Sequence, residues 1–192
     1  MTDFEKLNHS TSHLMAEAIS HLYPEAKFGF GPAIEEGFYY DVDFPQPITE
    51  EDLPAIEAEM RKIAAKNAKF ERIEVSKEEA KKLFKDNPYK LELIDGIEGQ
   101  ITIYKQGEWF DLCAGPHVES MGKIQNFKLL NIAGAYWRGD SKNKQLVRIY
   151  GTSWPSKKEL DDYLKVLEER EPCPTSSGCS IRPTWPATAS IP

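Results

Sequence analysis

The hydrophobic positions of this chain follow a helical period in some segments and a strand period in others. Near the N-terminus, apolar side chains recur every three or four residues. This stripe consists of Leu14, Met15, Ala18, Ile19 and Leu22. The spacing predicts a helix that begins after Asn8, a residue type favoured at N-caps, and ends before Pro24. His9 and His13 fall on the side opposite the stripe, among small residues, where a ligand can approach closely.

Strict alternation of apolar and polar residues predicts a strand from Gly37 to Phe44, with Tyr40 on its apolar face. Apolar spacing and capping residues predict three further helices, which cover 53–63 after Thr49, 77–84 after a capping box at Ser76, and 157–167 after a second capping box at Ser156. The remaining strand candidates are 91–94, 101–104, 109–113, 127–135 and 145–150. Strands in runs, with the helices segregated from them, predict an α+β fold with a largely antiparallel sheet.

Length and composition narrow the classes of protein. With 192 residues, of which 40% are hydrophobic, the chain can bury a substantial core as one domain with at most a small appendage. A formal net charge of -7 argues against a protein that is basic overall, but it leaves room for a local basic strip. No stretch resembles a membrane-spanning helix or a signal peptide. We therefore expect no membrane partner and a cytoplasmic location, which a lone Cys113 in the folded region also fits.

The composition changes after residue 170. From Pro172 onward the chain has five prolines in 21 residues, interspersed with Ser, Thr and Gly, and Arg182 is the only charged residue. Such a segment does not support an ordinary helix or strand. The sequence predicts a folded domain over 1–170 and a tail over 171–192 that is disordered or was added in cloning.

Three of the four histidines lie in two short motifs about a hundred residues apart. His9-Ser-Thr-Ser-His13 is on the first predicted helix, and Cys113-Ala-Gly-Pro-His117 follows a predicted strand. Imidazole and thiol groups bind metals and transfer protons, so this concentration predicts one site built from two distant segments. Taken separately, each motif also permits a plainer interpretation: two surface histidines in the first and a buried, inert thiol in the second.

The strand that leads to the second motif is unusual as a packing surface. Period-two alternation places Trp109, Asp111 and Cys113 on one face. The Gly115-Pro116 pair then turns the backbone and redirects His117. Cys-x3-His alone is a weak metal signature, because structural zinc sites usually combine Cys-x2–4-Cys or His-x3–5-His pairs.

Five motifs, in this order, resemble one family. They are His9-Ser-x-x-His-Leu14, Gly37-Phe-Tyr-Tyr-Asp-Val-Asp43, Asp111-Leu-Cys-Ala-Gly-Pro-His-Val118, Ala133-Gly-Ala-Tyr-Trp-Arg-Gly-Asp140 and Arg148-Ile-Tyr-Gly-Thr152. Together they resemble the editing domain of bacterial threonyl-tRNA synthetase, the second domain from its N-terminus, which is related to the editing domain of alanyl-tRNA synthetase. The resemblance covers roughly residues 7–169, nearly all of the predicted folded region.

The resemblance implies post-transfer editing, the hydrolysis of the aminoacyl ester of mischarged Ser-tRNA(Thr). Serine lacks one methyl group of threonine, and such a difference changes binding by only about 1–3 kcal/mol, so a threonine-activating site needs a second, hydrolytic pocket. The reaction needs a group that activates water, donors for the oxyanion, and help for the leaving ribose hydroxyl. The implied partners are the acceptor end of tRNA(Thr) carrying serine and the remaining domains of a full-length synthetase.

By resemblance, four side chains line this pocket: His9, His13, Cys113 and His117. His9 is expected to activate or position water, because a neutral imidazole is a competent base near pH 7. His13 is expected to position the water or the terminal ribose.

Four more residues are assigned by the same resemblance. Lys90 positions water, contacts the ribose or stabilises the oxyanion, and Asp111 binds the ammonium of the seryl group. Tyr40 and Gly31, with the neighbouring Gly-Phe-Gly-Pro segment, form the wall that excludes the threonine methyl group. The residues themselves leave simpler alternatives open: a solvated lysine at a strand edge for Lys90 and a core position for Tyr40.

A metal ion is the main alternative for the chemistry. In the alanyl branch the corresponding residues bind zinc, so zinc is possible here with the ligands His9, His13, Cys113 and His117. These four would fill a tetrahedral site, so that water could bind only by expansion of the coordination or by loss of a ligand. The threonyl branch resembles a version that works without metal, and we expect no required cofactor. Two competing functions remain, a zinc-dependent deacylase of another mischarged tRNA and a non-catalytic tRNA-binding module.

Basic residues that can contact RNA gather in the C-terminal third, namely Lys123, Lys128, Arg138, Lys142, Lys144 and Arg148. Tyr136 and Trp137 lie between them and can stack on a single-stranded CCA end, unless both are core residues. No class II aminoacylation core and no anticodon-binding domain follow the last helix, so aminoacylation is not expected. The chain is then either an excised editing fragment or a freestanding editing protein.

Overall fold

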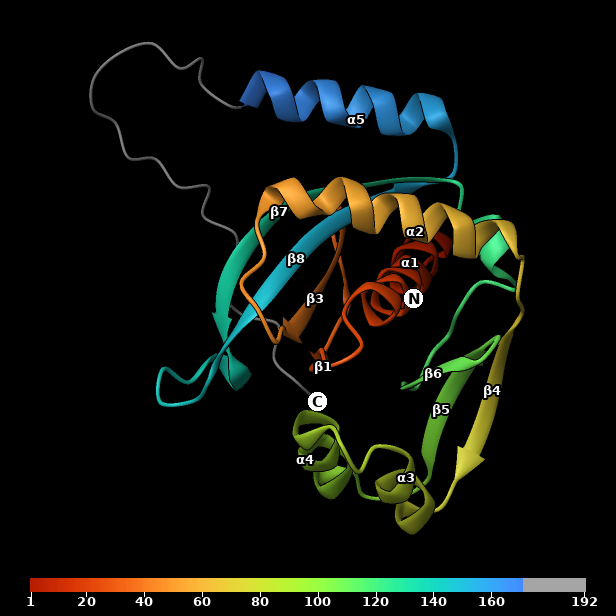
Figure 1. Ribbon diagram of the computed structural model, residues 1–192. Coiled ribbons are helices and arrows are strands. Elements are labelled where there is room, and N and C mark those ends of the chain that lie inside the picture. Colours follow the sequence, from red (N-terminus) through yellow and green to blue (C-terminus); the bar gives the residue numbers. More distant parts are fainter. Residues whose placement is uncertain (171–192) are drawn as a thin grey trace.

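The computed structural model of the chain describes residues 1–170, and the predicted tail over 171–192 lies outside the described residues. The described part has two antiparallel sheets around a central helix (Figure 1). The helices are α1 (Asp3–Leu22), α2 (Leu53–Ala65), α3 (Lys77–Leu83), α4 (Pro88–Gly96) and α5 (Lys157–Arg170). The strands are β1 (Lys27–Phe28), β2 (Ala33–Ile34), β3 (Gly37–Asp43), β4 (Phe70–Val75), β5 (Ile101–Gln106), β6 (Trp109–Leu112), β7 (Asn126–Tyr136) and β8 (Gln145–Trp154). The predicted α+β class is confirmed.

The larger sheet has the order β1-β3-β8-β7, with β2 paired to the other end of β3. Its centre is fixed by the antiparallel register of Tyr40 with Ile149 and of Asp41 with Arg148. Helices α1 and α2 pack against each other and against this sheet (Figure 1). The main core between them includes Leu14, Met15, Ile19, Phe38, Val42, Ile56, Met60 and Ile149.

The smaller sheet has the order β4-β5-β6, with Ile73 opposite Ile103 and Tyr104 opposite Asp111. A second, smaller core joins it to α3 and α4 and consists of Ala80, Phe84, Ile94, Ile101 and Ile103. The end of β6 reaches α1, which brings the second sequence motif beside the first. Strand β4 was not predicted, because its apolar residues do not alternate strictly, and these side chains are only partly buried in the fold.

The start of the first helix differs from the prediction. Helix α1 begins at Asp3, and Thr2 is its N-cap, with a complete capping box to Glu5. Asn8 is fully buried inside the helix, where its side chain accepts from the Ser153 backbone N–H at 2.8 Å and donates to the Ser153 carbonyl at 3.0 Å. Its polar amide therefore joins α1 to β8 rather than starting the helix.

The predicted strand over 91–94 is wrong, because these residues belong to helix α4. Asn87 caps this helix by accepting from the backbone N–H groups of Tyr89 and Lys90, and Pro88 occupies its first turn. A short apolar run does not distinguish a strand from a buried helix, and here the Asn-Pro start was the more informative signal.

The other predicted helices are confirmed. The capping boxes at Ser76 and Ser156 are both formed, and Thr49 precedes a single 3-10 turn (Glu50–Asp52) that leads into α2. Two more 3-10 turns cover Met121–Lys123 and Trp137–Gly139. Among residues 1–170 there is no helix with the length and apolar character needed to cross a membrane.

Candidate functional site

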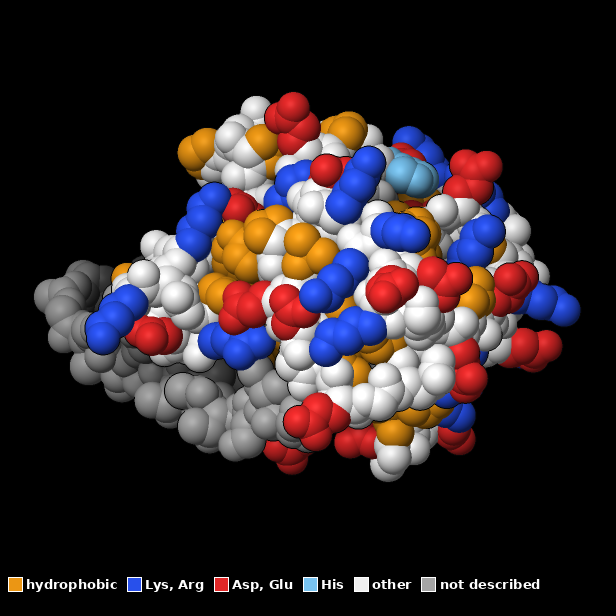
Figure 2. Space-filling view, turned by 90° about the horizontal axis from the view of Figure 1, so that it is seen from below, with side chains coloured by type: hydrophobic (Ala, Val, Ile, Leu, Met, Phe, Trp, Pro, Cys, Tyr) orange, Lys and Arg blue, Asp and Glu red, His pale blue; other side chains and the backbone are white. Residues whose placement is uncertain are grey.

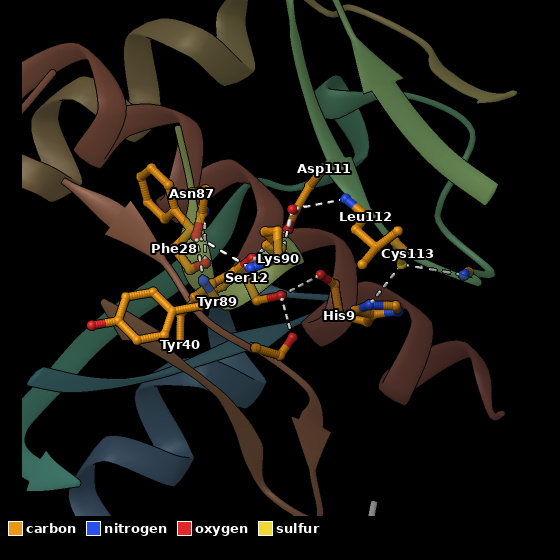
Figure 3. A network of polar contacts seen from close by, with 12 residues as sticks. His9, Ser12, Phe28, Tyr40, Asn87, Tyr89, Lys90, Asp111, Leu112 and Cys113 are labelled. Atoms are coloured by element: carbon orange, nitrogen blue, oxygen red, sulfur yellow. Dashed lines mark hydrogen bonds and ion pairs between the residues drawn. The ribbon is translucent and has the colours of Figure 1, made fainter. Parts of the chain in front are cut away.

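The two motifs meet as the sequence predicts. His9 and His13 project from α1, while Cys113 and His117 lie at and beyond the end of β6, and their four ligand-type atoms are within 4.8 Å of one another. The Cys113 thiol is central, since its Sγ lies 3.3 Å from Nε2 of His9 and 3.3 Å from Nε2 of His117 (Figure 3). We call these four residues the His/Cys cluster.

The loop after β6 shapes the second half of the cluster. Two hydrogen bonds tie the backbone of Cys113 to Thr102 of β5. The Cys113 N–H donates to the Thr102 carbonyl at 3.2 Å, and the Thr102 hydroxyl donates to the Cys113 carbonyl at 2.7 Å. Gly115 then adopts a positive φ of 73°, and its N–H donates to the Cys113 sulfur at 3.2 Å. A side chain at Gly115 would run into the ring of Tyr104, so a glycine is needed here both for backbone conformation and for space.

The position of His117 is fixed by Ser10, a residue between the two helix histidines. The Ser10 hydroxyl donates to the Lys6 carbonyl at 2.8 Å, accepts from the Val118 N–H at 2.9 Å, and lies 3.1 Å from His117 Nδ1. Because its one proton is already used, the hydroxyl accepts from Nδ1–H of His117. Nε2 of His117 is then the unprotonated nitrogen, and it faces the Cys113 thiol.

Burial keeps the whole His/Cys cluster uncharged. It lowers the pKa of His9, and it lowers the pKa of His13 well below the usual value with help from the neighbouring His117. Burial, reinforced by His9, lowers the pKa of His117 to about 2. The same desolvation raises the pKa of the Cys113 thiol to about 12. Near neutral pH the cluster therefore holds neutral imidazoles and a protonated thiol.

A second buried group, Lys90, Asp111 and Tyr40, adjoins the cluster through β6 (Figure 3). The Lys90 ammonium lies 2.6 Å from an Asp111 carboxylate oxygen and donates to the Tyr40 hydroxyl at 2.9 Å. The Tyr40 hydroxyl donates to the other Asp111 oxygen. Burial, and then Asp111, raise the pKa of Tyr40 well above the usual value, so the phenol keeps the proton that it donates. All three side chains are buried, with 3% or less of each residue exposed.

The predicted roles of this group need adjustment. Lys90 is not at a strand edge and is not solvated, because it lies in α4 and is 3% exposed. The Asp111 carboxylate already accepts from Lys90, Tyr40 and the Leu112 N–H, so a substrate ammonium would have to share it with Lys90. Tyr40 is buried like a core residue, and its hydroxyl also contacts Lys90 and Asp111. A core position and a place in the candidate site are therefore compatible for this residue.

Gly31 lies against Tyr40, the other residue of the predicted wall. A Cβ at this position would run into the Tyr40 ring. The Gly31 carbonyl accepts from the Ser12 hydroxyl at 3.0 Å, which ties this segment to α1 between the two histidines. Beside this group, an open groove of about 340 Å³ extends past Phe28, Asn87 and Trp109 to Asp111.

Several supporting residues were missed by the sequence analysis. Ser10 carried a usable signal, since it lies between the two histidines of the first motif. Gln106 is fully buried, and its amide donates to the His13 carbonyl at 3.2 Å and to Glu17 at 2.8 Å. Phe70 stacks flat on His117, with ring centroids 4.7 Å apart. Phe70 belongs to the unpredicted β4, so nothing local indicated this contact.

The His/Cys cluster fits a metal ion by donor type and spacing. Its imidazole and thiol donors are those that zinc prefers. His13 is 2% exposed, and its Nδ1 is buried without a hydrogen-bond partner among residues 1–170, which is the situation that a ligand or a water would relieve. These four residues can therefore hold a metal ion.

The predicted RNA-contacting strip is mostly neutralised within the fold. Four of its six basic side chains form ion pairs: Lys128 with Glu57, Arg138 with Glu92, Lys144 with Asp43, and Arg148 with Asp41. Trp137 is buried and donates its indole N–H to Glu92, so it is not available for stacking, whereas Tyr136 is 44% exposed. Figure 2 shows acidic and basic side chains intermixed on the face it presents, without a continuous basic strip.

Comparison with known proteins gives the class first. A family profile described as "Threonyl and Alanyl tRNA synthetase second additional domain" matches residues 101–150, which run from β5 through the Cys113 motif into β8. Over these residues the chain is similar to the additional domains of this family, which agrees with the resemblance that the motifs carry.

Within that class, the chain is similar to threonine–tRNA ligases. It is 57% identical over 164 residues to the Rubrobacter xylanophilus enzyme, 59% identical over 167 residues to one from a Geobacillus species, and 54% identical over 171 residues to that of Thermotoga maritima. These alignments cover 85–87% of this chain but only 26–27% of the relatives. The chain therefore spans about a quarter of the length of the ligases that it matches.

Proposed function

We propose that this domain hydrolyses the aminoacyl ester of Ser-tRNA(Thr), and so removes serine wrongly attached to the tRNA. The observation that carries the proposal is the His/Cys cluster beside the Lys90–Asp111–Tyr40 group, within a domain related to threonine–tRNA ligases. The cluster offers neutral bases for water, and the adjacent lysine offers a cation for a developing oxyanion. Such a reaction on tRNA takes place in the cytoplasm, with the acceptor end of tRNA(Thr) as the partner.

His9 is the residue proposed to accept a proton from water or to position it. It is more exposed than His13, the other α1 histidine of the cluster, and its lowered pKa keeps the imidazole unprotonated at neutral pH. His13 is almost fully buried, so we propose that it orients its neighbours rather than contacting the terminal ribose. Cys113 is protonated and donates within the cluster, which makes it a positioning group and not a nucleophile.

Lys90 is proposed to stabilise the oxyanion or contact the ribose. An ammonium has three donors, and two of those of Lys90 are used by Asp111 and Tyr40. One N–H is left to point at an ester oxygen. Asp111 then has two proposed tasks, to hold Lys90 and, by sharing its oxygens, to bind the seryl ammonium.

Discrimination against threonine is proposed to come from the wall formed by Tyr40 and Gly31. Tyr40 is tied to Lys90 and Asp111, and Gly31 packs directly on its ring, so the wall has little freedom to move. A rigid wall can reject an added methyl group by overlap, whereas a pocket for threonine rejects serine only weakly.

No metal is required in this proposal. If zinc is bound, His9, His13, Cys113 and His117 would hold it, and the ion would acidify a water only where its coordination expands or one of these ligands leaves. The fit of these donors makes a zinc-dependent deacylase of another mischarged tRNA the second candidate function.

The test is the deacylation rate of Ser-tRNA(Thr) and of Thr-tRNA(Thr), with and without a chelator. His9→Ala is the active-site variant. His21→Ala is its matched control, because His21 is on the same helix but pairs with Glu59 outside the cluster. We expect the wild-type chain to hydrolyse Ser-tRNA(Thr) and not Thr-tRNA(Thr), whether or not the chelator is present. His9→Ala should abolish this activity, and His21→Ala should keep it.

Two outcomes contradict parts of the proposal. Activity that disappears with the chelator and returns with zinc supports the zinc-dependent function instead. If neither tRNA is hydrolysed at protein concentrations that saturate tRNA binding, the result supports a non-catalytic tRNA-binding module instead.

A further inference from the structure

Lys90 reaches the site from a helix that lies outside both sheets. Helix α4 has nine residues, and it touches β1 of the larger sheet and helix α3. At helical spacing, Tyr89, Glu92 and Leu93 share one face of α4, while Lys90 and Ile94 share another. The first face meets the turn between β7 and β8, and the second carries the lysine into the site.

The β7–β8 turn holds α4 through Trp137 and Arg138. The Trp137 indole N–H donates to one carboxylate oxygen of Glu92 at 2.8 Å, and the Arg138 guanidinium lies 2.9 Å from the other. The Trp137 ring packs 5.0 Å from that of Tyr89, whose hydroxyl donates to Asp43 at 2.8 Å. Both carboxylate oxygens of Glu92 are therefore held by the turn.

The conformation of this turn is unusual for its sequence. Arg138 has a positive φ of 54°, which a residue with a side chain adopts at a cost, and in this conformation it forms its ion pair with Glu92. The Trp137 ring also fills the space over Gly29, where a Cβ would come within 2.9 Å of it. Gly29 precedes the Gly31 wall segment, so the same indole supports two parts of the site.

We propose that Trp137 and Glu92 are positioning residues for Lys90. Their contact fixes the rotation and depth of α4, and α4 in turn places the Lys90 ammonium between Asp111 and Tyr40. The role of this contact in catalysis rests on the proposed deacylation. Its role in placing Lys90 does not, and it can be measured without any substrate.

The first experiment measures the burial of Lys90 directly. The chain is treated with a small excess of an amine-modifying reagent, and the labelling rate of Lys90 is read by mass spectrometry. Glu92→Ala and Trp137→Phe are compared with two controls. Glu98→Ala removes an exposed carboxylate just beyond α4, and Trp154→Phe removes an indole N–H that bonds to Thr152 within β8. We expect labelling at least about threefold faster in the first two variants only, because a released α4 opens locally more often.

The second experiment measures deacylation by the same variants. A lysine displaced by about 1 Å is expected to lower kcat by about 10- to 100-fold. KM should stay within about twofold, because Trp137 is buried against Glu92 and neither side chain is proposed to contact the tRNA. The double variant Glu92→Ala/Trp137→Phe should be no slower than the worse single variant, because both remove one contact.

Labelling of Lys90 that is unchanged in both positioning variants overturns the proposal, whatever the activity. Faster labelling with kcat within twofold of wild type overturns the catalytic part. If the wild-type chain proves inactive, the proposed function fails, but the labelling rates still decide whether Trp137 and Glu92 place Lys90.

Discussion

The hydroxyl of Ser10 holds the ring of His117 in a single tautomer, although the two residues are 107 positions apart in sequence. The same hydroxyl accepts the N–H of Val118, so one small side chain on α1 sets both the backbone and the imidazole of the second motif. As a result the nitrogen that faces Cys113 carries a lone pair rather than a proton.

Ser10→Ala is expected to lower both stability and activity. The Val118 N–H and the His117 Nδ1–H lose their acceptor in a buried place, and each such loss costs about 1–3 kcal/mol. Ser20→Ala is the matched control, since Ser20 is on the same helix and its hydroxyl donates to the Glu17 carbonyl, outside the cluster. Chemical denaturation and the nitrogen NMR shifts of His117 measure the two effects. An unchanged tautomer in Ser10→Ala would contradict the role of the serine.

Stability should fall as the pH drops below about 6.5 in chelator-treated protein. The pKa values of His9, His13 and His117 are lowered in the folded state. At a pH between the lowered and the ordinary histidine pKa, the unfolded chain therefore binds more protons than the folded chain. Stability then rises with pH across this window, by at most about 1.4 kcal/mol per pH unit for each histidine.

Urea denaturation at several pH values measures this dependence. His117→Asn should remove part of the slope, because the folded pKa of His117, about 2, leaves it neutral throughout the range. A free energy of unfolding that is constant between pH 7 and 5 would show that these imidazoles are not desolvated.

Lys90→Met should be strongly destabilising. It leaves the Asp111 carboxylate buried without its cation, and breaking such a pair from one side costs about 3–5 kcal/mol. Adding Asp111→Asn should recover part of that loss, because the amide keeps an acceptor for Tyr40 and carries no charge.

The matched control for that variant is Lys144→Met. Lys144 forms an ion pair with Asp43 at 2.7 Å, close to the 2.6 Å of the Lys90–Asp111 pair. The Lys144 side chain is 64% exposed, however, so the substitution should cost no more than about 1 kcal/mol. Equal losses in Lys90→Met and Lys144→Met would mean that the Lys90–Asp111 pair is solvated.

Gly31→Ala should disturb the proposed wall against threonine. The new methyl group overlaps the Tyr40 ring, which must move or force the segment outward, at a cost of about 1–3 kcal/mol. The ratio of Ser-tRNA(Thr) to Thr-tRNA(Thr) hydrolysis should fall, as measured by initial rates. Gly96→Ala, where a Cβ meets nothing within 4 Å, is the control. A ratio that stays at the wild-type value would remove Gly31 from the wall.

The helices and strands that were predicted correctly have a sequence signal that lies within the element itself. The capping boxes at Ser76 and Ser156 satisfy backbone groups three residues away, so sequence alone identifies them. The two errors had the opposite origin. Asn8 looks like a cap but its amide is used by β8. The apolar residues of 91–94 pack in two directions, Ile94 into the core of the smaller sheet and Leu93 against the cluster that contains Trp137.

The sequence by itself determined the α+β class, the period of most elements, and the two motifs that supply the His/Cys cluster, because these depend on short-range spacing. Only the tertiary structure decided that Lys90 is buried against Asp111, that Ser10 fixes His117, and that Trp137 holds α4 instead of facing RNA. Those facts depend on hydrogen bonds and ion pairs between segments far apart in the chain. Spacing along one segment carries no information on which distant donor or charge it will meet.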